Sequence, residues 1–232
     1  MVSQDLPGVL RLNYSNGIVY AGTYMGLYYS NDSGVTWKLM QNGPKRNVPG
    51  LDVNNNIIVA EDVYITFNGT VHAKVLRSED LGSTFNTVNE WSVFVNIDSN
   101  DSVMIAANWF GGLYKSYDKG KNWVYDTISK RWDFTWTVFA MDSSTLFISA
   151  EPATVLRSDD NGRTWSDWTF NINSVANQFS IFGNYLFAAL SNNGVKRLKL
   201  KENENSSSDI LVYPNPTYDV INIDNPNLEK LS

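Results

Sequence analysis

Ser30-Asn31-Asp32-Ser33-Gly34-Val35-Thr36-Trp37 is the first of four octapeptides in this chain that share one pattern. In each, a serine is followed by aspartate at the third position, glycine at the fifth and an aromatic residue at the eighth. The other three carry this pattern at Ser78, Asp80, Gly82 and Phe85; at Ser116, Asp118, Gly120 and Trp123; and at Ser158, Asp160, Gly162 and Trp165. The aspartates recur at intervals of roughly 40 to 50 residues, close to the repeat of a four-stranded propeller blade.

The chemistry of the octapeptide predicts a hairpin turn that caps itself. Gly34 can adopt a positive φ without steric cost. The carboxylate of Asp32 and the hydroxyl of Ser30 can accept hydrogen bonds from amides of the turn, and Trp37 then begins the next strand and buries a large apolar face. All four octapeptides, called box turns below, lack the closing glutamate of an EF-type calcium loop. We therefore assign them a structural role and predict no metal site.

Short apolar runs divided by Asn, Gly, Asp and Ser surround every box turn, as in all-β proteins. Ile18–Ala21 and Gly26–Tyr29 are the two runs before the first. A fifth unit, over residues 179–200, has three such runs but no box turn and no evident fourth strand. The sequence predicts an all-β propeller of four-stranded antiparallel blades with about five blade units in residues 1–200, either a small ring or an incomplete one.

On these octapeptides, residues 8–200 resemble the Asp-box (BNR-repeat) β-propellers. That group includes sialidases, sortilin-type receptors, xyloglucanases and photosystem assembly factors. The resemblance implies the propeller fold and places the box turns on outer hairpins, away from the ligand face. It implies little about function, because propellers carry many activities.

The C-terminal residues differ in composition. Residues 201–209 are polar and are predicted to be a linker. Residues 210–232 contain Tyr213-Pro-Asn-Pro216, followed by Asp219 and an alternating apolar run to Ile223. They resemble the opening of a type IX secretion C-terminal sorting domain from Bacteroidetes, here truncated. The resemblance implies a secreted or cell-surface protein that meets the type IX secretion machinery through this tail. No signal peptide is visible at the N-terminus, so we expect the sequence to be a fragment.

Composition excludes several classes of function. The net charge is −6 and no cluster of Lys and Arg is present, which argues against nucleic-acid binding. No apolar run approaches the roughly 20 residues of a spanning helix, so we expect no membrane insertion. With no cysteine and one histidine, His72, thiolate sites and histidine-based metal sites or triads are not expected. We expect a monomer without a cofactor.

Several residues are not explained by the box turns and are candidates for a binding site. Alignment of the repeats puts Glu61, Trp109-Phe110 and Glu151 just after the second strand of a blade. Trp91 and Arg131-Trp132 fall between blades. Aromatic rings near polar loop residues are typical of glycan or protein binding sites. The alternative is that Trp91 and Trp132 cap the core between blades.

The segment Glu61–Lys74 is long for a connection between two strands of one blade. Its Asn68-Gly69 pair, between two strand-like runs, predicts a hairpin with a type I′ turn. Such a hairpin would project over the candidate site and either shape it or be a neutral insertion.

Two enzymatic hypotheses stand beside binding. Glu61 or Asp62 with Glu151 would make a paired-carboxylate glycoside hydrolase, unless these are solvated loop acids. Resemblance to sialidases would imply three arginines on the substrate carboxylate, but Arg77 and Arg157 share the slot before a box turn and are interpreted as scaffold. We therefore expect a non-enzymatic binding module for a glycan or a protein. A hydrolase would instead show two close carboxylates in one concavity, one with a raised pKa.

Overall fold

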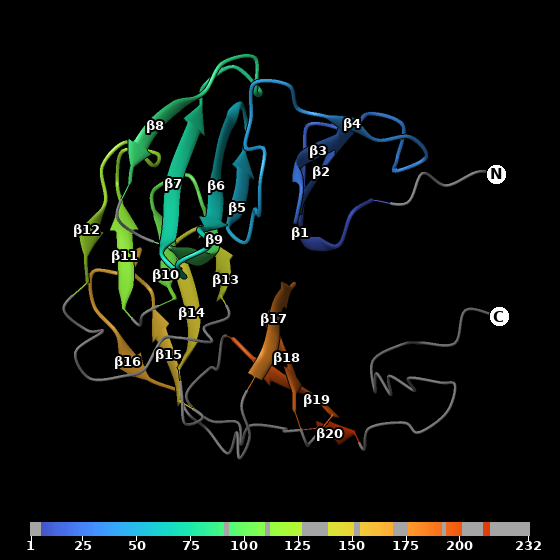
Figure 1. Ribbon diagram of the computed structural model, residues 1–232. Coiled ribbons are helices and arrows are strands. Elements are labelled where there is room, and N and C mark those ends of the chain that lie inside the picture. The colour runs from blue at the N-terminus through green and yellow to red at the C-terminus, as the bar shows by residue number, and fades with distance from the viewer. Residues whose placement is uncertain are drawn as a thin grey trace, which may run out of the picture.

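The computed structural model shows a β-propeller of five four-stranded antiparallel sheets (Figure 1). It describes residues 6–90, 93–109, 112–126, 139–150, 154–168, 176–191, 194–200 and 211–213. Over these ranges all regular structure is β, and no helix could span a membrane. The predicted fold class is confirmed.

Each sheet is one blade, with its strands in sequence order from the axis outward. The first blade contains β1 (Val9–Ser15), β2 (Ile18–Thr23), β3 (Gly26–Ser30) and β4 (Lys38–Leu39). The second contains β5 (Leu51–Asn54), β6 (Ile57–Ile65), β7 (Val71–Ser78) and β8 (Asn86–Asn89). The third contains β9 (Phe94–Ser99), β10 (Met104–Asn108), β11 (Leu113–Ser116) and β12 (Val124–Tyr125).

The fourth blade contains β13 (Phe139–Asp142), β14 (Thr145–Ala150), β15 (Thr154–Ser158) and β16 (Ser166–Asp167). The fifth contains β17 (Ala176–Phe182), β18 (Tyr185–Leu190), β19 (Gly194–Lys199) and β20 (Leu211–Tyr213). The innermost strands β1, β5, β9, β13 and β17 lie side by side in that order (Figure 1).

The fourth strand of the fifth blade, not evident in the sequence, is β20. Its residues pair with Val195–Arg197 of β19. They fall in the range 210–232 that the sequence assigns to the sorting domain, so the first residues of that range belong to the fifth sheet. The rest of the tail lies outside the described residues.

Each box turn is closed by its own side chains. In the first, the Ser30 hydroxyl donates to Asp32 Oδ1 at 2.7 Å and accepts from the Gly34 amide at 2.8 Å. The amide and hydroxyl of Thr36 donate to the two oxygens of Asp32, at 2.9 and 2.6 Å. The other three turns repeat these bonds, with an asparagine amide replacing the threonine hydroxyl in the third. The bonds from Thr36 and Ser30 stabilise the carboxylate and lower the pKa of Asp32 to about 2.

A cation before three of the box turns ties each blade to the next. Arg77 of the second blade donates to the backbone oxygen of Lys119 in the third at 2.5 Å. Lys115 of the third blade donates to the oxygen of Gly162 in the fourth. Arg157 of the fourth donates to Leu200 in the fifth at 3.1 Å. The interpretation of Arg77 and Arg157 as scaffold is confirmed by these bonds.

Arg77→Met is expected to lower the free energy of unfolding by about 2 kcal/mol, because it removes a buried charge-assisted hydrogen bond and leaves the Lys119 oxygen without that donor. Urea unfolding of the full chain measures this. Arg163→Met is the control, since Arg163 is exposed, makes a long hydrogen bond of 3.4 Å within its own turn and lies 5.9 Å from the ring of Tyr117, without a hydrogen bond to another described blade. Equal losses in the two variants would contradict the role of Arg77 between blades.

Candidate functional site

The two axial ends of the propeller differ in what they expose. One end carries the box turns. The other, called the hairpin end below, carries the β2–β3 turn, the β6–β7 hairpin and the residues after β10. Large apolar side chains are exposed at the hairpin end; they are Tyr24, Met25, Ile65, Phe67, Val71 and Trp109. Val35, Leu81 and Phe182 are exposed at the box-turn end as well. The hairpin end is the candidate site because β6 and β7, the longest described strands, carry Ile65, Phe67 and Val71 there, and exposed apolar side chains are typical of an interaction surface.

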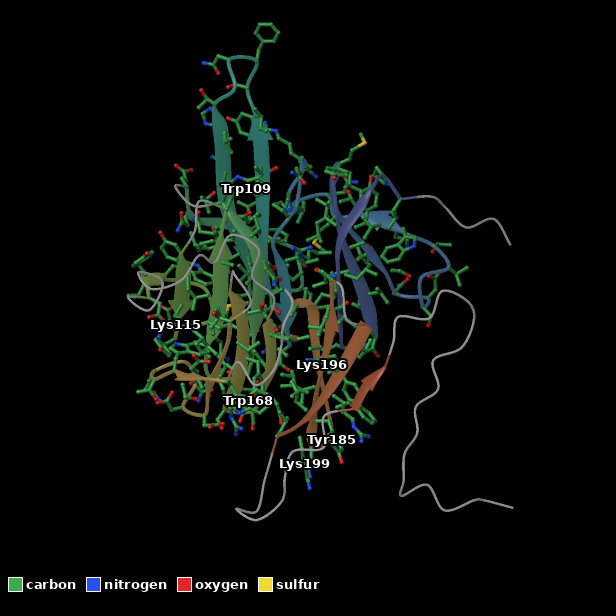
Figure 2. All side chains as sticks on the ribbon, turned by 90° about the horizontal axis from the view of Figure 1, so that it is seen from below. Trp109, Lys115, Trp168, Tyr185, Lys196 and Lys199 are labelled. Atoms are coloured by element: carbon green, nitrogen blue, oxygen red, sulfur yellow. The ribbon has the colours of Figure 1, made fainter. Side chains whose placement is uncertain are left out.

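The β6–β7 hairpin extends beyond the rest of this end (Figure 2). The Gly69 amide donates to the Thr66 oxygen at 2.9 Å and closes the turn. Phe67 at the tip is fully exposed. The predicted projecting hairpin is present, but its predicted turn type is wrong: Gly69 has φ 84° while Asn68 is not among the residues with positive φ, and a type I′ turn requires both.

Stacked side chains stiffen one face of this hairpin. The rings of Tyr64 on β6 and His72 on β7 are 4.7 Å apart and nearly parallel, at 9°. The Arg46 guanidinium lies over the Tyr64 ring at 4.0 Å from its centroid. The opposite face packs Val63 and Ala73 against Val93 of the third blade. A hairpin held on both faces presents its tip with little loss of conformational entropy on binding.

Trp109 lies beside the base of the hairpin (Figure 2). Its backbone amide donates to Val93 at 2.8 Å, and Val93 packs on the hairpin residues Val63 and Ala73. Half of its side chain is exposed. Of the aromatic and arginine residues predicted for the site, only Trp109 can be placed. Trp91, Phe110, Arg131 and Trp132 lie outside the described residues.

Glu61 does not occupy the position predicted for it. It lies inside β6, which continues to Ile65, and its side chain is fully buried. Oε1 accepts the amide of Phe94 in the third blade, whereas Oε2 is buried without a partner. Burial raises the pKa of Glu61 well above its ordinary value. Glu61 is therefore neither a solvated loop acid nor a group that substrate can reach.

The predicted pair joins Glu61 or Asp62 to Glu151. Successive side chains of a strand point to opposite faces, so Asp62 points away from the buried Glu61. The third candidate, Glu151, lies outside the described residues. Glu61 instead ties the second blade to the first strand of the third.

The stabilities of Glu61→Gln and Glu61→Leu distinguish the hydrogen bond that Glu61 accepts from the cost of its buried charge. The amide of Gln can still accept the Phe94 amide and carries no charge. Burial raises the pKa of Glu61, so the wild type should lose stability as the pH rises while Glu61→Gln should not. We expect Glu61→Gln to be more stable relative to the wild type at pH 8 than at pH 5. Glu61→Leu leaves the Phe94 amide unpaired and should cost about 1–3 kcal/mol at pH 5. Thermal unfolding at the two pH values measures both, and an effect of Glu61→Gln that is the same at the two pH values would contradict the assignment.

A second pair of carboxylates, missed in the sequence, lies between the innermost strands. Asp52 on β5 is almost fully buried and accepts Ser99 Oγ at 2.6 Å and Asn13 Nδ2 at 3.5 Å. Burial raises its pKa to about 6. Burial and then the charge of Asp52 raise the pKa of Asp98 on β9 to about 7. Two carboxyl groups this close share protons at neutral pH.

Asp52 does not have the access that catalysis requires, whereas Asp98 is partly exposed. Asp52 is 3% exposed, and its two oxygens are held by neighbouring side chains. The Arg11 guanidinium donates across the axis to the Val95 oxygen. Among the described residues, no group of three His, Asp or Glu side chains could hold a metal ion. The buried part of the polar axis thus contributes to packing.

Solved structures share this fold at low sequence identity. An ancestral GH74 enzyme matches with a TM-score of 0.66 and 16% identity, over 92% of this chain and 34% of that one. PorZ, a surface component of the type IX secretion system of Porphyromonas gingivalis, matches with 0.62 and 13%, over 91% and 27%. YCF48 from Cyanidioschyzon merolae matches with 0.60 and 13%, over 90% and 73%.

These likenesses establish the fold alone. The chain spans about a third of the GH74 enzyme and about a quarter of PorZ. No protein-family model matches the chain, and no curated protein matches it in sequence.

Proposed function

We propose that this chain is a non-enzymatic binding module whose hairpin end docks on a protein ligand outside the cell. The observation that carries the proposal is the rigid, protruding hairpin with a fully exposed phenylalanine at its tip. Tyr24, Met25 and Trp109 extend the apolar surface on the same end. Aromatic residues and methionine are enriched in protein interfaces.

A protein is favoured over a glycan because the exposed apolar groups include a protruding tip. Sugars and other small ligands are held in concave sites, where a few polar groups fix their orientation. Phe67 stands on a convex projection, which suits insertion into a pocket of a partner. A glycan remains the competing ligand in the test below.

Hydrolysis has no support among the described residues. Glu61 and Asp52 are buried inside the propeller. Asp62 is partly exposed, and its predicted partner Glu151 lies outside the described residues. A glycoside hydrolase needs two carboxyl groups within about 5–9 Å that both reach the substrate.

Site-specific photo-crosslinking of the full chain tests the docking surface. A photoreactive amino acid replaces Phe67 in one variant and Phe182 in the other. Phe182 is also exposed, at 78%, but ends β17 at the box-turn end. We expect protein adducts on intact cells from position 67 and not from position 182. The same adducts from both positions, or glycan-array binding without adducts, would overturn the choice of a protein ligand at this end.

We further propose that the chain is exported by the type IX route through its tail. The support is the pattern Tyr213-Pro-Asn-Pro216 with the alternating run that follows. The test supplies a signal peptide to the chain in a type IX-competent bacterium and compares it with a form ending at Tyr213, which keeps β20. We expect only the longer form on the surface. Equal surface display would overturn this proposal and leave the binding proposal intact.

A further inference from the structure

The boundaries between consecutive blades repeat one packing arrangement. Four hydrophobic clusters fill the boundaries from the first blade to the fifth. In each of the first four blades, the residue just before the box turn pairs with one residue of the second strand. That second-strand residue is buried and faces the following blade. These residues are Tyr20, Val59, Ile105 and Phe147. No described cluster joins the fifth blade to the first.

The first blade has an uncovered face. On the innermost strand of the first blade, Leu12 pairs with an alanine of the second strand, Ala21. Three later blades have the same pairing, and the innermost-strand residues there are Leu51, Ile97 and Phe179. Those later residues pack on the preceding blade and are 3%, 4% and 5% exposed, whereas Leu12 is 65% exposed. Tyr14, two residues on, is 69% exposed, while its counterpart Val53 is 5% exposed.

The fifth blade has the matching uncovered face. Phe187 pairs with Arg197 as Val59 pairs with Arg77 and Phe147 with Arg157. Phe187 is only half-buried. Arg197 stacks on Tyr185 of its own blade at 4.6 Å, whereas Arg77 and Arg157 donate to the following blade.

Among the described residues, no preceding blade packs on the first box turn, and its glycine shows this. A Cβ on Gly82, Gly120 or Gly162 would meet side chains of the preceding blade, such as Met40, Val59 and Lys115. A Cβ on Gly34 would meet only Trp37 of its own turn, at 3.7 Å. The uncovered faces of the first and fifth blades are thus the two halves of a boundary that is filled everywhere else.

We propose that these two faces bind each other between two copies of this chain, with the fifth blade of one copy against the first blade of the next. A second copy supplies both halves with the side chains that already pack together inside one chain. Charge agrees as well: Arg197 and Lys199 lie on the fifth blade, and the exposed carboxylate of Asp32 lies in the first box turn. Such a contact is heterologous, so it forms closed rings or chains of copies. On this proposal the chain self-associates, whereas a monomer was expected from the sequence.

Mass in solution is the first readout. The average mass of the wild type, measured by light scattering, should rise above the 26.1 kDa of one chain as concentration increases. Leu12→Glu should weaken the association at least tenfold without unfolding the chain, because Leu12 is already exposed. Val124→Ser changes an exposed residue on the outer strand β12 of the third blade and should leave it unchanged. A single-chain mass at every concentration would overturn the proposal.

Cross-linking identifies the faces, since the chain has no cysteine of its own. A Leu12→Cys variant mixed with a Phe187→Cys variant and a short bis-maleimide should give linked dimers. Val124→Cys mixed with Phe187→Cys should give none, because Val124 lies on the outer strand of the third blade. If the double variant Leu12→Cys/Phe187→Cys links within single chains and the mixture of single variants stays unlinked, the propeller closes on itself and the proposal is wrong.

Discussion

Gly120→Ala is expected to lower the free energy of unfolding by about 3 kcal/mol. Gly120 has φ 80°, and a left-handed conformation costs an alanine about 1–2 kcal/mol. The new Cβ would also lie 2.8 Å from Val59 Cγ2 of the second blade and 3.1 Å from Met104 Sδ. Overpacking of this kind adds about 1–3 kcal/mol. Urea unfolding of the purified full chain measures the loss.

Gly34→Ala is the matched control, because Gly34 has the same role in the first box turn. Its φ is 85°, but its Cβ would have open space on the side of a preceding blade. Only the backbone cost should remain, so the loss should be about 1–2 kcal/mol. Equal losses at the two positions would mean that box turns do not differ in their contact with a preceding blade.

The second large effect is a loss of stability as the pH rises from about 4 to 7. Asp52 and Asp98 have raised pKa values of about 6 and 7 in the folded chain. The folded state therefore binds more protons than the unfolded state in this range, and stability falls with increasing pH. The two shifts together set an upper limit of about 7 kcal/mol for the pair. We expect a smaller loss, of about 2–4 kcal/mol, because the pair shares protons and Asp98 is only partly ionised at pH 7.

Asp98→Asn tests this assignment. The variant has no second charge beside Asp52, so it should lose about half as much stability as the wild type between pH 5 and 8. Asp101→Asn alters an exposed aspartate and should follow the wild type. Chemical unfolding at several pH values gives the profile. Parallel curves for the wild type and Asp98→Asn would contradict the coupling of the two carboxyl groups.

At low pH the box turns should make the stability of the fold rise with increasing pH, opposite to the effect of Asp52 and Asp98. Hydrogen bonds lower the pKa of Asp32 and Asp80 to about 2. Their contribution is present above the ordinary pKa of aspartate, near 4, and is lost as the pH falls toward 2. The two effects together place the stability maximum between about pH 4 and 5.

The box turns were predictable because every bond that closes them is local. Ser30, Asp32, Gly34 and Thr36 bond only to one another within the turn. The period of the turns then indicated four-stranded blades. By contrast, β20 has three residues and is separated from its partner β19 by residues 200–210. Nothing local marks such a strand.

The acids were harder to place. Glu61 is polar and follows an apolar run, so the sequence suggested the end of a strand, whereas β6 continues to Ile65. Asp52 and Asp98 belong to different blades, and only the packing of β5 beside β9 brings them together. The signal that could have found them is a charged residue at an inner-strand position in two successive repeats.

The most direct test of the binding proposal is the affinity of the partner identified at position 67. Titration calorimetry would compare the wild type, Phe67→Ser, Trp109→Ala and Phe182→Ser. We expect Phe67→Ser and Trp109→Ala each to weaken binding at least tenfold, or about 1.4 kcal/mol, and Phe182→Ser to leave it unchanged. Full affinity in Phe67→Ser and Trp109→Ala, or a loss confined to Phe182→Ser, would show that the hairpin end is not the binding surface.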